Sequence, residues 1–273
     1  MLEILSLGAG VQSTTLLLMS ENGILPRLDY AIFADTQWEP SYVYSHLEWL
    51  KTKTSIPIIT VSAGSLPEET LAKKGKDRIG DSKNPPFFVQ GDKPGIGMLW
   101  RGCTKYYKIQ PIERKIREIL GLRRSQRISP GVHVRQWRGI SVDEMHRAGC
   151  SRTKWIVNIY PLIDLRMRRH DCLQWLEKHG FPLPKRSACL GCPYRSDAEW
   201  RFLQQESPED WEKACKFDDA LRIGLPLPGV RGQTYLHKSA IPLRLLGSFE
   251  TQDEKSGQYD LFSEKECSGM CGV

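Results

Sequence analysis

Short apolar runs alternate with stretches of helical spacing in the first part of the chain. Residues 2–7 form an apolar run that ends in a glycine turn, and residues 11–22 have the apolar spacing of a helix that Gly23 ends. The pattern continues with a strand at 30–34, a helix at 42–53 and a strand at 58–61. This alternation predicts right-handed βαβ crossovers, and therefore a doubly wound α/β fold with a mostly parallel sheet and helices on both faces.

Glycine, proline and charged residues interrupt the pattern between residues 64 and 102. We interpret this stretch as a long loop, and loops of this length inside a compact domain are usually functional lids or disordered segments. Regular structure resumes with a helix at 110–120, where Pro111 suits the first turn. Strands at 132–140 and 155–160 and a helix at 170–179 follow.

The length of the chain, 273 residues, suits one main domain with a smaller appendage. We place the core at residues 1–180, including the long loop, and an accessory region at 181–273. Pro182 and Pro184 mark the boundary, and the accessory region holds five of the eight cysteines and a polar tail. No run of about 18 apolar residues and no secretory signal pattern is present. We therefore expect a cytoplasmic protein whose thiols are reduced and which has no membrane partner.

Positive charge is concentrated in the middle of the chain. Between Arg101 and Arg201 there are 22 Lys or Arg residues and 9 Asp or Glu residues, whereas the rest of the chain has 17 and 23. A segment this basic favours a polyanionic partner such as nucleic acid. A solvated basic surface beside a nucleotide site is the alternative interpretation.

The loop after the first strand carries the first candidate chemistry. Its small residues, from Ser6 to Thr14, let backbone N–H groups approach a phosphate at the positive end of the following helix, and Ser13 and Thr14 add hydroxyl donors. The Gly-Lys-Ser/Thr of a Walker loop is absent, and the glycine spacing differs from that of the dinucleotide fingerprint. The loop alone therefore predicts a phosphate site.

This loop resembles the pyrophosphate-binding loop, Ser-Gly-Gly-Lys-Asp-Ser, of the N-type ATP pyrophosphatases and the sulfonucleotide (PAPS) reductases. Residues 8–13 fall on those six positions, with Gly8, Val11 and Gln12 in place of Ser, Lys and Asp. The resemblance implies an adenine nucleotide alpha hydrolase-like fold and a site for ATP with Mg²⁺.

Three later segments resemble motifs of the same superfamily in the same order. They are residues 33–36 with Glu39 and Pro40, residues 103–108 with Pro111, and residues 139–144 with Arg147. The resemblance implies that residues near 33–35 flank the adenine and phosphates, and that the later segments contact phosphate or substrate. The predicted nucleotide site comprises Ser6, Gly8, Ala9, Gly10, Gln12, Ser13, Thr14, Phe33 and Ala34, and the predicted catalytic residues are Asp35, Cys103, Lys108 and Arg147.

Cys189 and Cys192 lie on a tight turn where Gly191 allows both sulfurs to face one metal or cluster. Two thiols cannot complete four-coordination. The resemblance places Cys103 near this pair, and Cys267 or Cys271 could supply a fourth ligand. We therefore expect a ligand set of Cys103, Cys189, Cys192 and Cys271.

Three interpretations of these cysteines remain open: a [4Fe–4S] cluster, a zinc ion, and a redox pair without metal. Cys150, Cys172 and Cys215 are expected to be structural thiols.

The chain is most similar to the ATP pyrophosphatase component of DNA phosphorothioation systems. That resemblance implies ATP-dependent adenylation of nucleic acid, DNA rather than tRNA, with a cysteine desulfurase as sulfur donor; a homodimer is a further expectation. The alternatives are tRNA thiolation, sulfonucleotide reduction and a nucleotide-sensing subunit without catalysis. Reduction is disfavoured because the C-terminal Glu-Cys-Gly-Leu-His motif of the reductases is replaced by Glu266-Cys-Ser-Gly-Met-Cys271.

Overall fold

The computed structural model describes residues 1–72, 83–92, 94–123, 126–223, 227 and 230–247. Its centre is a five-stranded, fully parallel sheet with the strand order β3-β2-β1-β6-β7. The strands are β1 (Leu2–Leu7), β2 (Tyr30–Asp35), β3 (Ile58–Ser62), β6 (Val134–Trp137) and β7 (Ile156–Ile159). The predicted strands are confirmed, although β6 and β7 are shorter than the apolar runs that indicated them.

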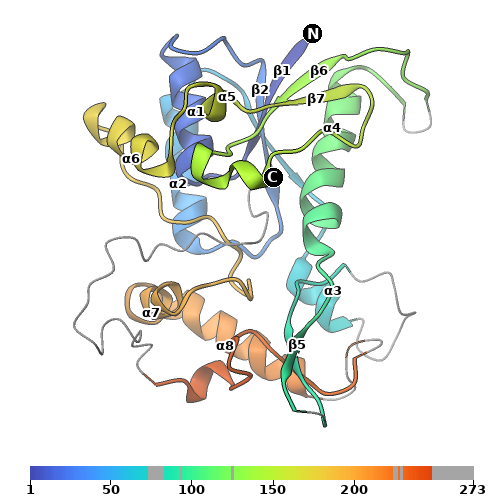
Figure 1. Cartoon of the computed structure of the whole chain (residues 1–273), viewed down its shortest axis with the longest axis vertical. Coiled ribbons are helices and arrows are strands. Elements are labelled where there is room, and N and C mark those ends of the chain that lie inside the picture. Colours follow the sequence, from blue (N-terminus) through green and yellow to red (C-terminus); the bar gives the residue numbers. More distant parts are fainter. Residues whose placement is uncertain (73–82, 93, 124–125, 224–226, 228–229, 248–273) are drawn as a thin grey trace.

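Helices cover both faces of this sheet, as the α/β pattern predicts. Helices α1 (Val11–Glu21), α2 (Ser41–Lys53), α5 (Pro161–Asp164) and α6 (Arg169–Lys178) lie on one side, and α4 (Gln110–Ile119) lies on the other (Figure 1). Side chains of β1 alternate between the two faces. Leu5 packs in the cluster beneath α1, and Ile4 packs with Ile112 and Ile116 of α4. The doubly wound fold is confirmed.

The prediction of one long loop at 64–102 is wrong in part. This stretch contains helix α3 (Leu66–Ala72) and strands β4 (Phe88–Gln90) and β5 (Ile96–Met98). Strand β4 pairs antiparallel with β5 and with β8 (Gln233–Tyr235), forming a second, three-stranded sheet. Strands of three residues give little periodicity, and β8 lies far along the chain, so the pattern of residues 64–102 could not indicate this pairing.

The helix predicted to begin at residue 110 is preceded by a π-helical segment, η1 (Thr104–Ile109), that runs directly into α4. π-Helical turns are uncommon and often occur at functional sites. Cys103 and Lys108 lie at the two ends of this segment, and Tyr107 within it is buried.

A second core lies below the carboxyl ends of the parallel strands, where α3, α7 (Asp197–Glu206) and α8 (Pro208–Arg222) gather (Figure 1). Trp38 enters this core from the loop after β2, and its ring centroid is 4.2 Å from that of Phe217. Strand β8 joins the 64–102 stretch to the region beyond residue 181, and the division of the chain at 180/181 stays a prediction.

No helix among the described residues is long and apolar enough to span a membrane.

Candidate functional site

The parallel sheet has a topological switch point between β1 and β6. From β1 the chain passes through α1 to β2 on one side, whereas β6 lies on the other side of β1 and continues to β7. In open α/β sheets, ligands bind at the carboxyl ends of the strands at such a point. The segments there are the β1–α1 loop (residues 8–10) and the loop after β6 (residues 138–141).

The β1–α1 loop turns sharply into helix α1. Ala9 has a φ of 54°, and Gly10 is the N-cap residue without a side-chain cap. The N–H groups in the first turn of a helix have no intrahelical acceptor, so this end of α1 is suited to an anion. The Ser13 hydroxyl accepts a hydrogen bond from Gly8 N at 3.2 Å and donates to Gly10 O at 3.3 Å. Ser13 therefore holds the turn itself, a role that the sequence did not indicate.

Gly139 brings the loop after β6 against helix α1. A Cβ atom at Gly139 would lie 2.9 Å from Ser13 N, closer than real Cβ contacts. Gln12 adds a second connection, because its Nε2 donates to Glu144 Oε2 at 3.1 Å. Glu144 also forms an ion pair with Arg147, and both side chains are buried. Gln12 thus connects helix α1 to Glu144, and the same carboxylate holds Arg147; Gln12 and Arg147 are both predicted site residues.

Arg138 is a buried cation at the switch point that sequence reasoning missed. It is 6% exposed and donates to Ser6 Oγ at 3.3 Å and to Gln136 Oε1 at 3.1 Å. Gln136 Nε2 in turn donates to Ser6 Oγ at 2.7 Å. Burial lowers the pKa of Arg138 to about 10. An arginine next to Gly139, directly after an apolar strand, was the signal in the sequence that could have identified it.

Three other residues of the predicted nucleotide site, Phe33, Ala34 and Thr14, are buried. Phe33 and Ala34 are buried in the two cores on either side of the sheet. Thr14 is fully buried, and its hydroxyl lies 3.0 Å from His46 Nε2. Burial lowers the pKa of His46 to about 4, so this imidazole is neutral at physiological pH.

At the end of β2 the chain places acidic residues close to a lysine of η1. Asp35 Oδ1 accepts from Gln37 N at 2.7 Å and from the Tyr44 hydroxyl at 2.8 Å. Glu39 is 4% exposed, and its Oε1 lies 3.6 Å from Lys108 Nζ. Within the described residues Glu39 Oε2 is buried without a hydrogen-bond partner.

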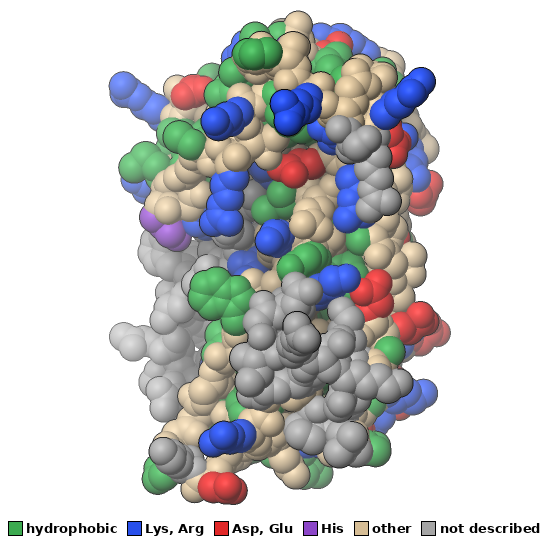
Figure 2. All heavy atoms as spheres, turned by 90° about the vertical axis from the view of Figure 1, so that its right-hand side faces the viewer, with side chains coloured by type: hydrophobic (Ala, Val, Ile, Leu, Met, Phe, Trp, Pro, Cys, Tyr) green, Lys and Arg blue, Asp and Glu red, His purple; other side chains and the backbone are tan. Residues whose placement is uncertain are grey.

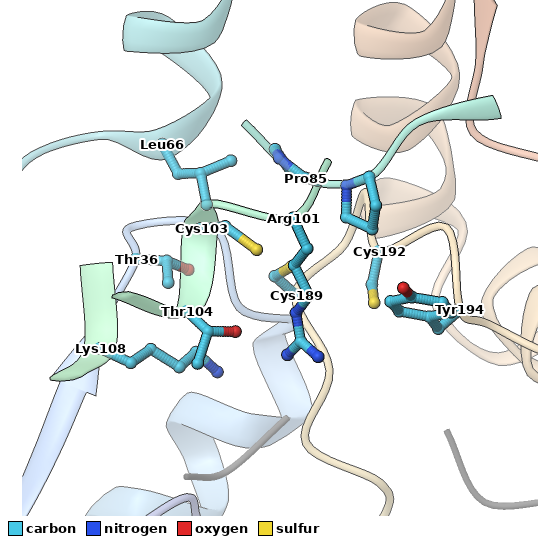
Figure 3. A pocket seen from close by; sticks show the side chains of 11 residues that line it. Thr36, Leu66, Pro85, Arg101, Cys103, Thr104, Lys108, Cys189, Cys192 and Tyr194 are labelled. Carbon is cyan, nitrogen blue, oxygen red and sulfur yellow. The ribbon is translucent and has the colours of Figure 1, made fainter. Parts of the chain in front are cut away.

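Three cysteines meet in one pocket, which we call the thiol pocket. Cys103, Cys189 and Cys192 line it, together with Thr36, Leu66, Pro85, Pro86, Arg101, Thr104, Lys108 and Tyr194 (Figure 3). The figure shows Arg101 and Lys108 extending toward the same end of the pocket. The predicted proximity of Cys103 to the Cys-X-X-Cys turn is present in the structure.

The environment of the thiol pocket favours the protonated forms of Cys103 and Cys189. Burial raises the pKa of Cys103, and Arg101 opposes this effect. A hydrogen bond with Cys192, followed by burial, raises the pKa of Cys189 well above its usual value, whereas Lys108 acts in the opposite direction. A thiolate is the reactive form of cysteine, so reaction at this pocket requires a group that takes the proton or adds positive charge.

The shape of the Cys-X-X-Cys turn depends on Trp38. Leu190 N donates to Trp38 O at 2.8 Å, and a Cβ atom at Gly191 would lie 1.8 Å from the Trp38 ring. Arg195 Nη2 donates to Ala188 O at 2.5 Å and to Cys189 O at 3.2 Å, and this side chain is buried. The turn is thus held by a backbone bond, a glycine contact and a buried guanidinium.

Among the described residues, no three His, Cys, Asp or Glu side chains are arranged so that they could hold a metal ion. Cys267 and the proposed ligand Cys271 lie outside the described residues. The six cysteines within them are free thiols, of which Cys172 and Cys215 are buried as expected, whereas Cys150 is exposed.

The β1–α1 loop lies next to the segment that leads into the Cys-X-X-Cys turn of the thiol pocket. A Cβ atom at Gly10 would lie 2.8 Å from Ser187 Oγ, and Ser187 comes two residues before Cys189. The Tyr42 hydroxyl, on the first turn of α2, donates to Arg186 O at 3.3 Å. The candidate phosphate site and the candidate sulfur site are therefore neighbours at the same edge of the sheet.

No protein-family model matches the chain, and no curated protein matches its sequence. Among solved structures, the phosphoadenylyl-sulfate (PAPS) reductase of Candida auris in a phosphate complex is similar to 69% of this chain and 80% of its own, with 14% identity and a TM-score of 0.44. Similarity at this level carries no inference about function. The fold is therefore assigned from the sheet topology, and the site from its own geometry.

Replacing Gly191 with alanine is expected to destabilise the protein, because the new methyl group would overlap the Trp38 ring. Overpacking of this kind costs about 1–3 kcal/mol. Urea unfolding would measure the loss, and the rate of thiol labelling would show whether Cys189 and Cys192 become accessible. Gly149→Ala is the matched control, since nothing lies within 4 Å of its new Cβ. Equal stability of the two variants would contradict the Trp38 contact.

The buried His46 is expected to make stability depend on pH. Its pKa is about 4 in the folded chain and about 6.5 in the unfolded chain, so the unfolded state binds more protons between these values. The free energy of unfolding should therefore fall by about 2 kcal/mol between pH 7 and pH 5 from this group alone. Urea unfolding of the wild type and His46→Gln at both pH values isolates the effect. The same fall in both proteins would show that His46 is not responsible.

Proposed function

We propose that this chain is an enzyme of the ATP pyrophosphatase type that activates a nucleic-acid substrate for sulfur insertion, with DNA phosphorothioate modification as the process that fits best. The observation that carries the proposal is the close approach of the β1–α1 loop to the segment before the Cys-X-X-Cys turn, where Gly10 lies against Ser187. A reaction that first activates a substrate with ATP and then delivers sulfur needs these two sites side by side.

The activation step uses the switch point. A substrate oxygen attacks the α-phosphorus of ATP, the bond to the β-phosphate breaks, and pyrophosphate leaves with the electron pair. The first turn of α1 would receive the phosphates, and the buried Arg138 adds positive charge at the same edge. Asp35 is the carboxylate at this edge that would hold Mg²⁺, which when bound neutralises charge on the departing pyrophosphate.

The sulfur step uses the thiol pocket. A cysteine desulfurase would convert one thiol of the Cys-X-X-Cys turn into a persulfide, and its terminal sulfur would attack the activated phosphorus while AMP leaves with the electron pair. The other thiol of the turn, which is within hydrogen-bond distance, would then attack the inner sulfur. The thiolated substrate would leave, and an external thiol reductant would reduce the resulting Cys189–Cys192 disulfide. This step requires that a buried thiol lose its proton. The positive charges of Lys108 and Arg101 favour the thiolate.

The charge distribution supports a polyanionic substrate. Many Lys and Arg side chains lie on the half of the molecule that contains the sheet, on the face shown in Figure 2. In the sequence, Lys and Arg residues outnumber Asp and Glu residues between Arg101 and Arg201. A nucleic acid is the substrate class that such a surface attracts.

Pyrophosphate release tests the proposed activity. We expect the wild-type protein to release pyrophosphate from ATP and Mg²⁺ when DNA is present, and less when tRNA replaces it. The protein without nucleic acid and the nucleic acid without protein are the controls. Failure to release pyrophosphate with either substrate would sink the enzymatic proposal and favour a nucleotide-sensing subunit. Release of sulfite from a sulfonucleotide would instead identify a reductase.

Single substitutions separate the two sites. Ser13→Ala removes the hydroxyl that bonds Gly8 N and Gly10 O, and each such bond is worth about 1 kcal/mol. Its affinity for ATP, measured by calorimetry, should fall about fivefold to thirtyfold. Cys189→Ala should bind ATP as the wild type does but fail to transfer sulfur. The reverse order of ATP affinities would show that the nucleotide site lies elsewhere.

A further inference from the structure

Trp100 is the most exposed large apolar side chain among the described residues, with 84% of its surface accessible. It follows β5, the edge strand of the three-stranded sheet, and Ile96 and Met98 lie at alternate positions before it. These two side chains are 44% and 43% exposed. A tryptophan this exposed leaves both faces of its ring open to a planar partner.

Lys and Arg residues are frequent in the sequence on either side of this tryptophan. Between Lys83 and Lys108 the sequence has five Lys or Arg residues and one Asp. Lys83 Nζ and Lys105 Nζ lie 5.5 and 5.2 Å from the centroid of the same ring, that of Tyr106. Within the described part of the chain, neither lysine forms an ion pair with a carboxylate. Two ammonium groups on one ring repel each other, and an anion bound between them removes the repulsion.

The backbone fixes these groups next to one another. Gly102 N and Cys103 N both donate to Asn84 O, at 3.1 and 3.3 Å, and Tyr106 N donates to Gly102 O at 3.3 Å. The segment that carries Lys83 is therefore bonded to the segment that carries Trp100 and Lys105.

Arg101 connects this surface to the thiol pocket. Its side chain lines the pocket with Cys103, and its guanidinium carbon lies 5.7 Å from the centroid of the Tyr194 ring. Trp100 is its neighbour in the chain. A ligand on Trp100 would therefore be held one residue along the chain from a side chain that lines the thiol pocket.

We propose that Trp100, Arg101, Lys83, Lys105 and Tyr106 form a binding site for single-stranded nucleic acid, which we call the Trp100 site. A base stacks on Trp100, and a backbone phosphate lies between Lys83 and Lys105. The role of this site in sulfur insertion rests on the proposed function, whereas the binding itself does not.

A single strand suits the site better than a duplex or a peptide does. Stacking requires an open base face, which a duplex keeps inside its helix, and aromatic platforms with cations are typical of single-strand sites. A peptide that added a strand to β5 would use Ile96 and Met98 but would leave the lysine pair without a partner. A nucleotide can stack its base on the Trp100 ring and place its phosphate against the two ammonium groups.

Fluorescence anisotropy with labelled oligonucleotides, measured on the full chain without ATP, tests the Trp100 site. Stacking of one base is worth about 1–3 kcal/mol, so Trp100→Ala should weaken binding of a single strand about fivefold to a hundredfold. Trp100→Phe should recover part of the affinity. Leu245→Ala, which removes a side chain 74% exposed on another element, is the control and should bind as the wild type does.

The lysine pair has its own readout. The double variant Lys83→Ala/Lys105→Ala should lower the slope of log affinity against log salt concentration by about 0.7, the value for one phosphate contact on a single strand. Equal affinity of Trp100→Ala and wild type for single-stranded DNA and RNA would overturn the proposal. So would a change of oligomeric state in Trp100→Ala without a change in nucleic-acid binding, because the surface would then hold a second copy of the chain.

These outcomes are independent of the pyrophosphate assay. If Trp100→Ala loses single-strand binding and the wild type releases no pyrophosphate, the Trp100 site stands and the proposed function fails. If the wild type releases pyrophosphate with DNA and Trp100→Ala binds single strands normally, the proposed function stands and the Trp100 site fails.

Discussion

Close approach of backbone segments at the carboxyl edge of the sheet is the constraint on which the rest of the site depends. Gly10 lies against Ser187, Gly139 against Ser13 N, and Gly191 against the Trp38 ring, each at a distance that leaves no room for a Cβ atom. These contacts join the β1–α1 loop, the loop after β6 and the Cys-X-X-Cys turn. A side chain at any of the three positions would push against the neighbouring segment and change the spacing at this edge.

Buried charges hold the same edge together. Glu144 links Gln12 to Arg147, Glu39 pairs with Lys108, and Arg138 is bonded to Ser6 and Gln136. Breaking a buried ion pair costs several kcal/mol because it leaves an uncompensated charge. The predicted catalytic residues Lys108 and Arg147 thus have structural partners, and a substrate that engages them must compete with Glu39 and Glu144.

Local pattern indicated the parallel sheet and its helices because each element has its own apolar spacing. Strand β4 was not predicted because it is short and because its partner β8 lies far along the chain, at residues 233–235. The proximity of Cys103 to Cys189 followed from the resemblance, whereas no residue pattern indicates the contact of Gly191 with Trp38. Arg138 and the role of Ser6 were missed because they depend on hydrogen bonds between distant segments. The role of Ser13 was missed because its bonds to Gly8 and Gly10 depend on the folded shape of the loop.

The differences between the β1–α1 loop and the loop that it resembles can be followed in the structure. Val11 stands where the resembled loop has lysine, and it is 2% exposed in the core beneath the sheet. Gln12 stands where that loop has aspartate, and as an amide it donates to Glu144, which an aspartate could not do. Arg138 approaches Ser6 from the neighbouring strand end. Positive charge at this edge therefore comes from the β6 side of the switch point, and the amide at Gln12 connects that side to the loop.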